Sequence, residues 1–150
     1  MSTTTASRPG NVIATPHRAA PVVALCVLGA GLSVASGAIH LHLWNIAYRH
    51  IPNGHLDKLF LVQLILCFVG AAAVLVMRNV LAAVADALLL LGTYGGYLIT
   101  RYHGWFGFDP GKAIDTKWAT WSMVVEIAGA VVLFLAAGLM VRGRPASSTA

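Results

Sequence analysis

The chain has 150 residues, of which 58% are hydrophobic and only 10% are charged, and it carries a net charge of +5. Soluble domains carry about 25% charged residues, so this chain has too few charges to cover a water-facing surface. Its Lys and Arg residues lie at the ends and in the loops, which is typical of flanks of membrane segments and not of a nucleic-acid-binding face. The composition therefore predicts one membrane domain, with the lipid bilayer as a partner and no nucleic acid.

The chain begins with residues 1–21, which are rich in Ser, Thr, Ala and Pro and are predicted to be a disordered tail. Four apolar segments follow, and each has about the 20 residues that a membrane-spanning helix needs. They cover residues 22–46, 59–77, 80–100 and 118–141. Residues 142–150 form a second disordered tail. Because only helices and closed barrels span lipid, and no strand-like alternation occurs, we expect an all-α, integral membrane four-helix bundle over residues 22–141.

The first apolar segment also has features of a signal peptide. The run "PVVALCVLGAGLSV" is followed by "ASGA", which resembles a small-residue cleavage site. The apolar run nevertheless continues beyond that site through Ile39, Leu41, Leu43 and Trp44. This continuation favours a first transmembrane helix.

Four spans place both tails on the same side of the membrane, but the charges do not decide which side. The tails and the turn near Arg78 carry five Lys or Arg residues, and the opposite loops carry five as well. The loops that bear His and Trp resemble an outer face. We therefore expect a multi-pass protein of the cell membrane with both termini in the cytoplasm.

Each predicted helix has one stripe of small or polar residues, which is where helices pack in lipid. In the first helix, Gly29, Ser33, Gly37 and His40 share a stripe, while His42 points to a flank. The corresponding stripes of the other helices are Gln63, Cys67, Gly70 and Val74; Asp86, Thr93, Tyr97 and Thr100 with Gly92 and Gly96; and Ser122, Glu126, Ala130, Leu133 and Ala137.

The polar residues of these stripes converge in the outer half of the bundle, which predicts a ligand-binding cavity there. The candidate ligand-binding residues are His40, Gln63, Thr93, Tyr97 and Glu126. A carboxylate inside a transmembrane helix costs about 3 kcal/mol, so Glu126 and Asp86 are functional candidates by default. We expect His40 and Glu126 to lie within reach of each other.

Both carboxylates also have structural interpretations. Glu126 could serve helix packing alone, by bonding to His40, Gln63 or Tyr97. Asp86, nearer the inner end, could pair with Arg78 or with backbone groups.

A metal or haem site is a weaker hypothesis. His40, His103 and Glu126 include ligand types that suit copper or zinc, but they have no diagnostic spacing. A haem on His40 would need a second axial ligand, which only His50, His55 or His103 in the loops could supply. Cys26 and Cys67 lie inside apolar runs, which argues against a disulfide framework or a zinc site. No cofactor is predicted, with haem or copper as the alternatives.

The segment "HLHLWNIAYRHIPNGHLDKLFLVQ" resembles a region of an uncharacterised family of small four-span membrane proteins common in actinobacterial genomes. Members show a His, then Leu-Trp, Tyr-Arg-His-Ile-Pro, a Gly turn and Leu-Phe-Leu, and "WFGFD" is similar to a Leu-Phe-Gly-Phe segment there. The chain departs from the family pattern at "NGHLDK". The resemblance implies a four-helix topology and no activity.

Three functions remain open at the level of sequence. The favoured one is a binding or accessory subunit, alone or in a larger membrane complex. The alternatives are a small proton-coupled carrier using Glu126 and His40, and a metal- or haem-dependent redox protein. No nucleophile motif occurs around Ser122, so an enzyme is the less favoured reading.

Overall fold

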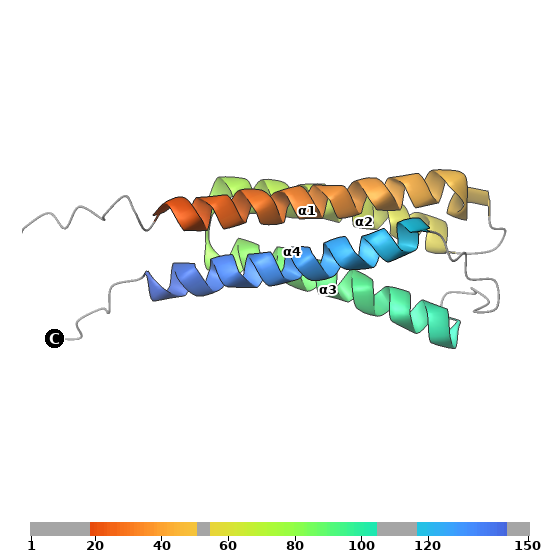
Figure 1. The fold of residues 1–150 in the computed structure, drawn as a ribbon. Coiled ribbons are helices and arrows are strands. Elements are labelled where there is room, and N and C mark those ends of the chain that lie inside the picture. The colour runs from red at the N-terminus through yellow and green to blue at the C-terminus, as the bar shows by residue number, and fades with distance from the viewer. Residues whose placement is uncertain (1–18, 51–54, 105–116, 144–150) are drawn as a thin grey trace, which may run out of the picture.

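The computed structural model describes residues 19–50, 55–104 and 117–143. These residues form four long helices, α1 (Ala19–Ile46), α2 (Leu56–Met77), α3 (Val80–His103) and α4 (Lys117–Arg142), and a short 3-10 turn, η2 (Tyr48–His50). The helices lie side by side along one axis (Figure 1). Each of the four is long and apolar enough to cross a membrane. The prediction of an all-α, four-helix bundle is confirmed.

The helices extend somewhat beyond the predicted segments. Helix α1 begins at Ala19, inside the stretch expected to be tail, because alanine favours helix and Pro21 lies in the first turn, where its missing N–H is tolerated. Helix α3 continues to His103, where Arg101 and His103 suit the negative end of the helix dipole, and Gly104 ends it in the left-handed conformation. The remainder of the two predicted tails lies outside the described residues.

A tight turn joins α2 to α3. Arg78 ends α2 in the left-handed conformation, and its Nε donates to the Leu75 carbonyl at 3.0 Å. Asn79 then begins α3 because its side-chain oxygen accepts the Ala82 backbone N–H at 2.8 Å. This turn lies at the same end of the bundle as Ala19 and Arg142, which we call the tail end (Figure 1). The opposite end, with η2 and Gly104, is the loop end.

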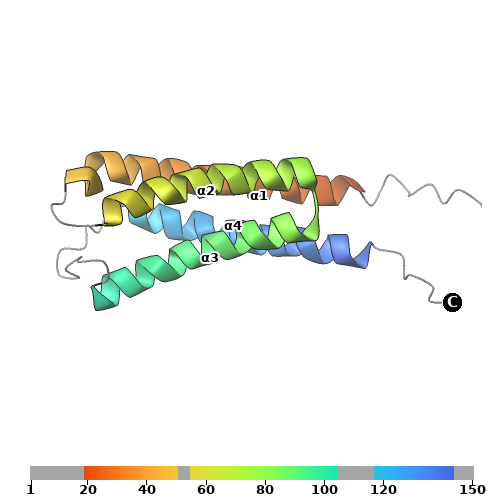
Figure 2. The ribbon, with the colours of Figure 1, turned by 180° about the vertical axis from the view of Figure 1, so that it is seen from behind.

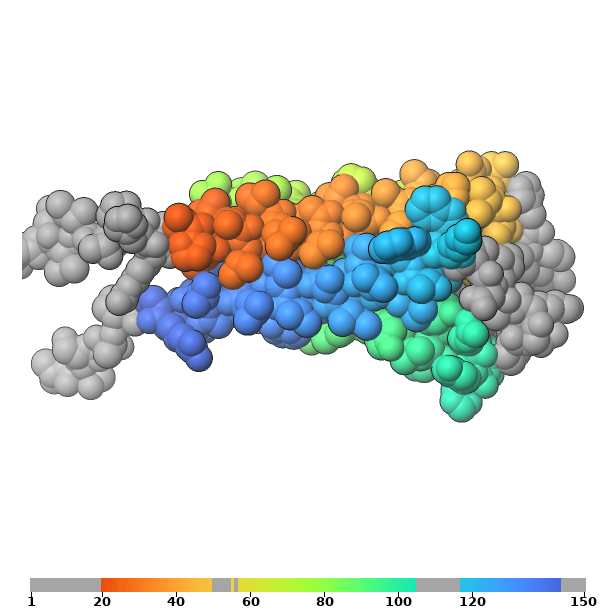
Figure 3. Space-filling view, viewed as in Figure 1, coloured from red at the N-terminus to blue at the C-terminus, as the bar shows by residue number. Residues whose placement is uncertain are grey.

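Small residues allow the helices to approach closely. A Cβ at Gly29 would meet the Leu133 side chain, and one at Gly129 would meet Leu90. Helix α1 packs against α2 and α4, while α4 also packs against α3. The side chains of α1 and α4 close the face between these two helices (Figure 3). The predicted stripes of α1, α2 and α4 are therefore the packing faces.

Helix α3 leaves the bundle toward the loop end. Its buried residues are all in its first half: Ala82, Ala83, Asp86, Ala87 and Leu90. From Leu91 to Gly104 none is buried. Figure 2 shows α3 diverging from α2 along this second half.

The divergence corrects one part of the predicted packing. Gly92 and Gly96 were expected to bring α3 close to a neighbour, yet nothing lies within 4 Å of a Cβ built at either position. The smallness of these residues instead leaves space beside the helix.

Candidate ligand-binding site

The site begins with a histidine and a glutamate that face each other inside the bundle. His40 on α1 is 8% exposed and Glu126 on α4 is 1% exposed. The Nε2 atom of His40 lies 3.8 Å from Oε1 of Glu126. The predicted proximity of this pair is confirmed, while its role in binding stays a prediction.

Two serine hydroxyls hold the carboxylate in place. Ser36 donates to Oε1 of Glu126 at 3.2 Å, and Ser122 donates to the same oxygen at 2.8 Å. Both serines are buried. From the sequence, Ser122 was predicted to be a packing residue, and Ser36 was not identified as part of a site. The spacing could have revealed both, because each lies four residues from a member of the pair, on the same helix face.

A backbone carbonyl fixes the tautomer of His40. Its Nδ1 lies 2.9 Å from the carbonyl oxygen of Ser36. A carbonyl can only accept, so Nδ1 carries the proton, and in the neutral ring Nε2 is left as an acceptor. The 3.8 Å separation from Glu126 is too long for a direct hydrogen bond. Nε2 is therefore available to a third group.

The pair lies at the polar floor of a cavity of about 520 Å³. This volume is within the range of about 300–1,000 Å³ that is usual for small-molecule sites. Apart from a few polar groups, the lining is apolar. The cavity is lined by His40 and Leu43 of α1, Tyr48 of η2, Leu59, Phe60, Val62, Gln63 and Leu66 of α2, Leu88, Leu89, Gly92, Thr93, Gly96, Tyr97 and Thr100 of α3, and Ala119, Ser122, Met123 and Glu126 of α4.

One wall of the cavity faces outward between α2 and α3. Four of its lining residues are also exposed at the surface: Leu59 by 39%, Val62 by 49%, Leu66 by 43% and Leu88 by 56%. All four are aliphatic and belong to the two helices that diverge. In a membrane these exposed side chains would face the lipid chains.

Aromatic side chains lie toward the loop end of the cavity. Tyr48 stacks on Phe60 with ring centroids 4.2 Å apart, and Phe60 lies 5.1 Å from the His40 ring. Burial, together with the nearby Tyr97 phenol, raises the pKa of Tyr48, so its hydroxyl is neutral at physiological pH. Tyr97 in turn accepts a hydrogen bond of 2.8 Å from Arg101.

All five predicted ligand-binding residues line this cavity, and each has a hydrogen bond to a residue four positions away on its own helix. Gln63 donates to the Cys67 sulfur at 3.3 Å, and Thr93 donates to the Leu89 carbonyl at 2.9 Å. The partners expected for Glu126 were His40, Gln63 or Tyr97. The described hydrogen bonds of Glu126 come instead from Ser36 and Ser122, because these hydroxyls lie within one turn of the pair.

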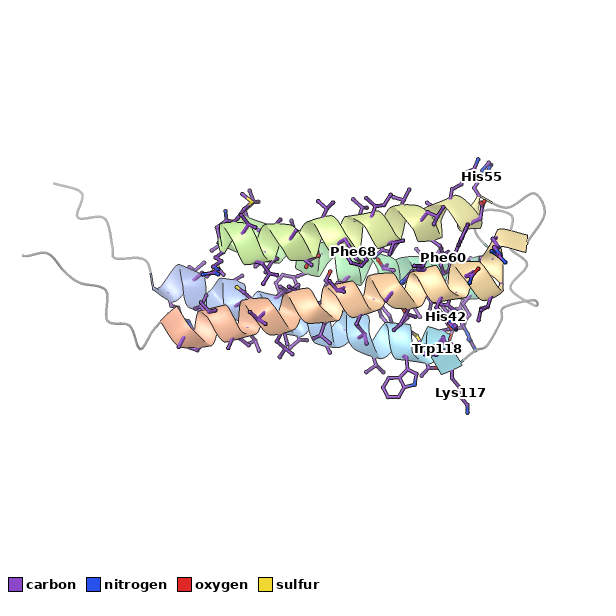
Figure 4. All side chains as sticks on the ribbon, turned by 90° about the horizontal axis from the view of Figure 1, so that it is seen from above. His42, His55, Phe60, Phe68, Lys117 and Trp118 are labelled. Carbon is purple, nitrogen blue, oxygen red and sulfur yellow. The ribbon has the colours of Figure 1, made fainter. Side chains whose placement is uncertain are left out.

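The three residues of the metal hypothesis are not alike in their surroundings. His103 is exposed near the end of α3, whereas His40 and Glu126 are buried. Within the described residues, no group of three or more His, Cys, Asp or Glu could hold a metal ion. Of the other histidines, His42 lies on the surface, as expected, with its ring 4.7 Å from that of Trp118 (Figure 4).

A second polar cluster lies nearer the tail end. Ser33 donates to Oδ1 of Asp86 at 3.0 Å, and Gly70 faces the same carboxyl group. The other oxygen, Oδ2, is buried and has no hydrogen-bond partner among the described residues. The expected partner Arg78 donates to a backbone carbonyl of its own helix instead. Asp86 thus joins α1, α2 and α3 through Ser33 and Gly70.

No family model, no curated protein and no solved structure matches this chain. The interpretation of the site therefore rests on its own geometry, and the resemblance noted in the sequence stays a prediction.

Proposed function

We propose that this protein is a binding protein of the cell membrane that takes an amphiphilic small molecule from the bilayer into the cavity between α2 and α3. The observation that carries the proposal is the cavity of about 520 Å³ with a lipid-facing aliphatic wall and a buried polar floor. The protein would act alone or as a subunit of a larger membrane complex.

The two ends of the cavity suit the two ends of such a molecule. The wall formed by Leu59, Val62 and Leu66 suits an apolar body, which could move in sideways without crossing water. The floor formed by His40 and Glu126 suits a polar head group. A few convergent polar groups in an apolar pocket are the usual arrangement of a small-molecule site.

A purely structural role for the pair explains less. Membrane helices can be held together by small residues alone, and Gly29 and Gly129 already provide such contacts here. A pair that served helix packing alone would also not require a cavity beside it. The polar groups and the open volume together support binding.

A proton-coupled carrier is the second candidate, because polar groups continue from the cavity toward the tail end. Ser36 bonds to Glu126, while Ser33, one turn away on α1, bonds to Asp86. Ser33 also donates to the Cys67 backbone carbonyl at 3.4 Å. This row of groups connects two buried carboxylates in different halves of the bundle.

We further propose that the tail end is cytoplasmic and that the cavity lies in the outer leaflet. Cysteines introduced at Thr5 and Ser148 should react with a membrane-impermeant maleimide only from the cytoplasmic side. Labelling of both from outside would reverse the orientation, and labelling from opposite sides would contradict the four-span topology.

Filling the cavity tests the binding proposal directly. In Gly96→Phe, the ring would occupy space that is open in the structure, because nothing lies within 4 Å of a Cβ at Gly96. We expect photolabelling by a diazirine-bearing octanol in bilayer nanodiscs to fall by about tenfold, which corresponds to about 1.4 kcal/mol of binding energy. Peptide mass spectrometry should locate the wild-type label on α2 and α3.

Gly95→Phe is the matched control. Gly95 also has nothing within 4 Å of its Cβ, but it does not line the cavity. This variant should keep the wild-type labelling. Equal labelling of wild type and Gly96→Phe, or a wild-type label spread evenly over all four helices, would contradict the proposed function.

A further inference from the structure

We propose that the ligand of this cavity is a lipophilic amine in its protonated form, and that it replaces a proton held by His40 and Glu126 when the site is empty. This inference rests on the proposed function and specifies the chemical class of its ligand. It follows from the hydrogen-bond roles, the charges and the aromatic groups around the pair.

The floor of the cavity offers acceptors and few donors. The hydroxyl hydrogens near the pair are already used within the protein: Ser36 and Ser122 on Glu126, Thr93 on Leu89, and Thr100 on Gly96. The His40 Nδ1 proton is used on the Ser36 carbonyl. Next to the pair, the groups left to meet a ligand are the Nε2 lone pair and the Glu126 carboxyl group, while the Tyr97 hydroxyl and the second amide N–H of Gln63 are donors elsewhere on the lining. Such a floor suits a head group that donates hydrogen bonds, as an ammonium does.

The charges around the pair also favour a head group that carries a positive charge. No Lys or Arg is among the described residues that line the cavity. The Cys67 thiol of α2 lies close enough to feel the charges of both Glu126 and Asp86 of α3. Arg101 of α3 is bonded to Tyr97 toward the loop end. Thus, within the described part of the chain, no Lys or Arg lines the cavity or forms an ion pair that would balance an ionised Glu126.

An unbalanced carboxylate inside a membrane is costly, so the empty site must hold one proton. That proton resides on Glu126, or on His40 opposite an ionised Glu126, and in both forms the pair as a whole is neutral. When an ammonium enters, one proton leaves to the solution. One positive charge is exchanged for another, so the net charge of the occupied site equals that of the empty one.

Aromatic rings beside the pair would add to the attraction. Phe60 lies 5.1 Å from the His40 ring, and Tyr48 is stacked on Phe60. The face of an aromatic ring attracts a cation by about 0.5–2 kcal/mol, most strongly where water is excluded. The same rings would give no such preference to an anion.

The test compares three probes that differ only in their head groups: octylamine, octanol and octanoate. Isothermal titration calorimetry on the full chain in detergent micelles, with empty micelles as the blank, gives the affinity of each. Octylamine should bind at least about tenfold more tightly than octanol, and octanoate most weakly. Repeating the titration in buffers of different ionisation enthalpy should show release of about one proton per octylamine bound, and none for octanol.

Glu126→Gln keeps the volume of the side chain but cannot ionise. In this variant octylamine should lose its advantage over octanol and release no proton. Circular dichroism in the same micelles shows whether the variant has folded. If the variant does not fold, the proton release measured on wild type alone tests the amine inference.

The outcomes separate the two proposals. Octanol and octylamine binding equally well, without proton release, would overturn the amine inference and leave the proposed function standing. Tighter binding of octanoate would overturn the inference as well. Failure of all three probes to bind would overturn both.

Discussion

Gly70→Ala is expected to lower the free energy of unfolding by about 2–4 kcal/mol, because it places a methyl group where the Asp86 carboxyl group lies. Asp86 cannot move aside freely. Its Oδ1 is held by Ser33, and its side chain is 2% exposed. Relief of the overlap would therefore break the hydrogen bond or separate α2 from α3. The measurement is unfolding by sodium dodecyl sulfate in mixed micelles, followed by circular dichroism.

Two comparisons isolate this contact. Gly138→Ala adds the same methyl group on α4 where nothing lies within 4 Å, so it should leave stability unchanged or raise it by up to about 1 kcal/mol. In an Asp86→Ala background, Gly70→Ala should cost at least about 1.5 kcal/mol less than in wild type. If Gly70→Ala were as stable as Gly138→Ala, α2 and α3 would not be in close contact at Gly70 and Asp86.

Much of the fold could be predicted because membrane helices follow simple rules. Length and hydropathy located the four spans, since a helix must cover the hydrocarbon thickness. Small residues at four-residue spacing identified the packing faces of α1 and α4, and Gly29, Ser33, Ala130 and Leu133 lie on them as expected. Shared depth along neighbouring helices was enough to bring His40 and Glu126 together.

The cavity itself could not be predicted in the same way. Gly92 and Gly96 have the spacing of a close helix contact, yet they lie beside open space. Whether two helices touch along their full length depends on their relative tilt, which the loops and distant contacts set, and no local pattern encodes it. The position of Tyr48 on Phe60 depends likewise on how the chain turns after α1.

The hydrogen-bond partners of the two carboxylates could be predicted only in part. Ser36 and Ser122 could have been found from the helical period. The bond from Ser33 to Asp86 could not, because it depends on how far α3 is displaced along α1. Sequence thus predicted that both carboxylates face the interior, but not which groups would satisfy them.

The His40–Glu126 pair leads to the second large expected effect. Glu126→Leu alone should lower the free energy of unfolding by about 1–3 kcal/mol, because the Ser36 and Ser122 hydroxyls and the His40 Nε2 lose their polar neighbour. His40→Phe alone should have a similar effect, since it leaves the buried carboxyl group facing an apolar ring. Stability in mixed micelles is measured as for Gly70→Ala.

The double variant His40→Phe/Glu126→Leu should be as stable as wild type or up to about 4 kcal/mol more stable. The reason is that a buried polar pair contributes little more to the free energy of unfolding than apolar residues of similar volume. The serine hydroxyls can then bond to carbonyls of their own helices, as Thr93 already does. If the pair existed for packing, the double variant would instead be the least stable of the three. A stable double variant that no longer distinguishes octylamine from octanol would mean that the pair is kept for binding, at the expense of stability.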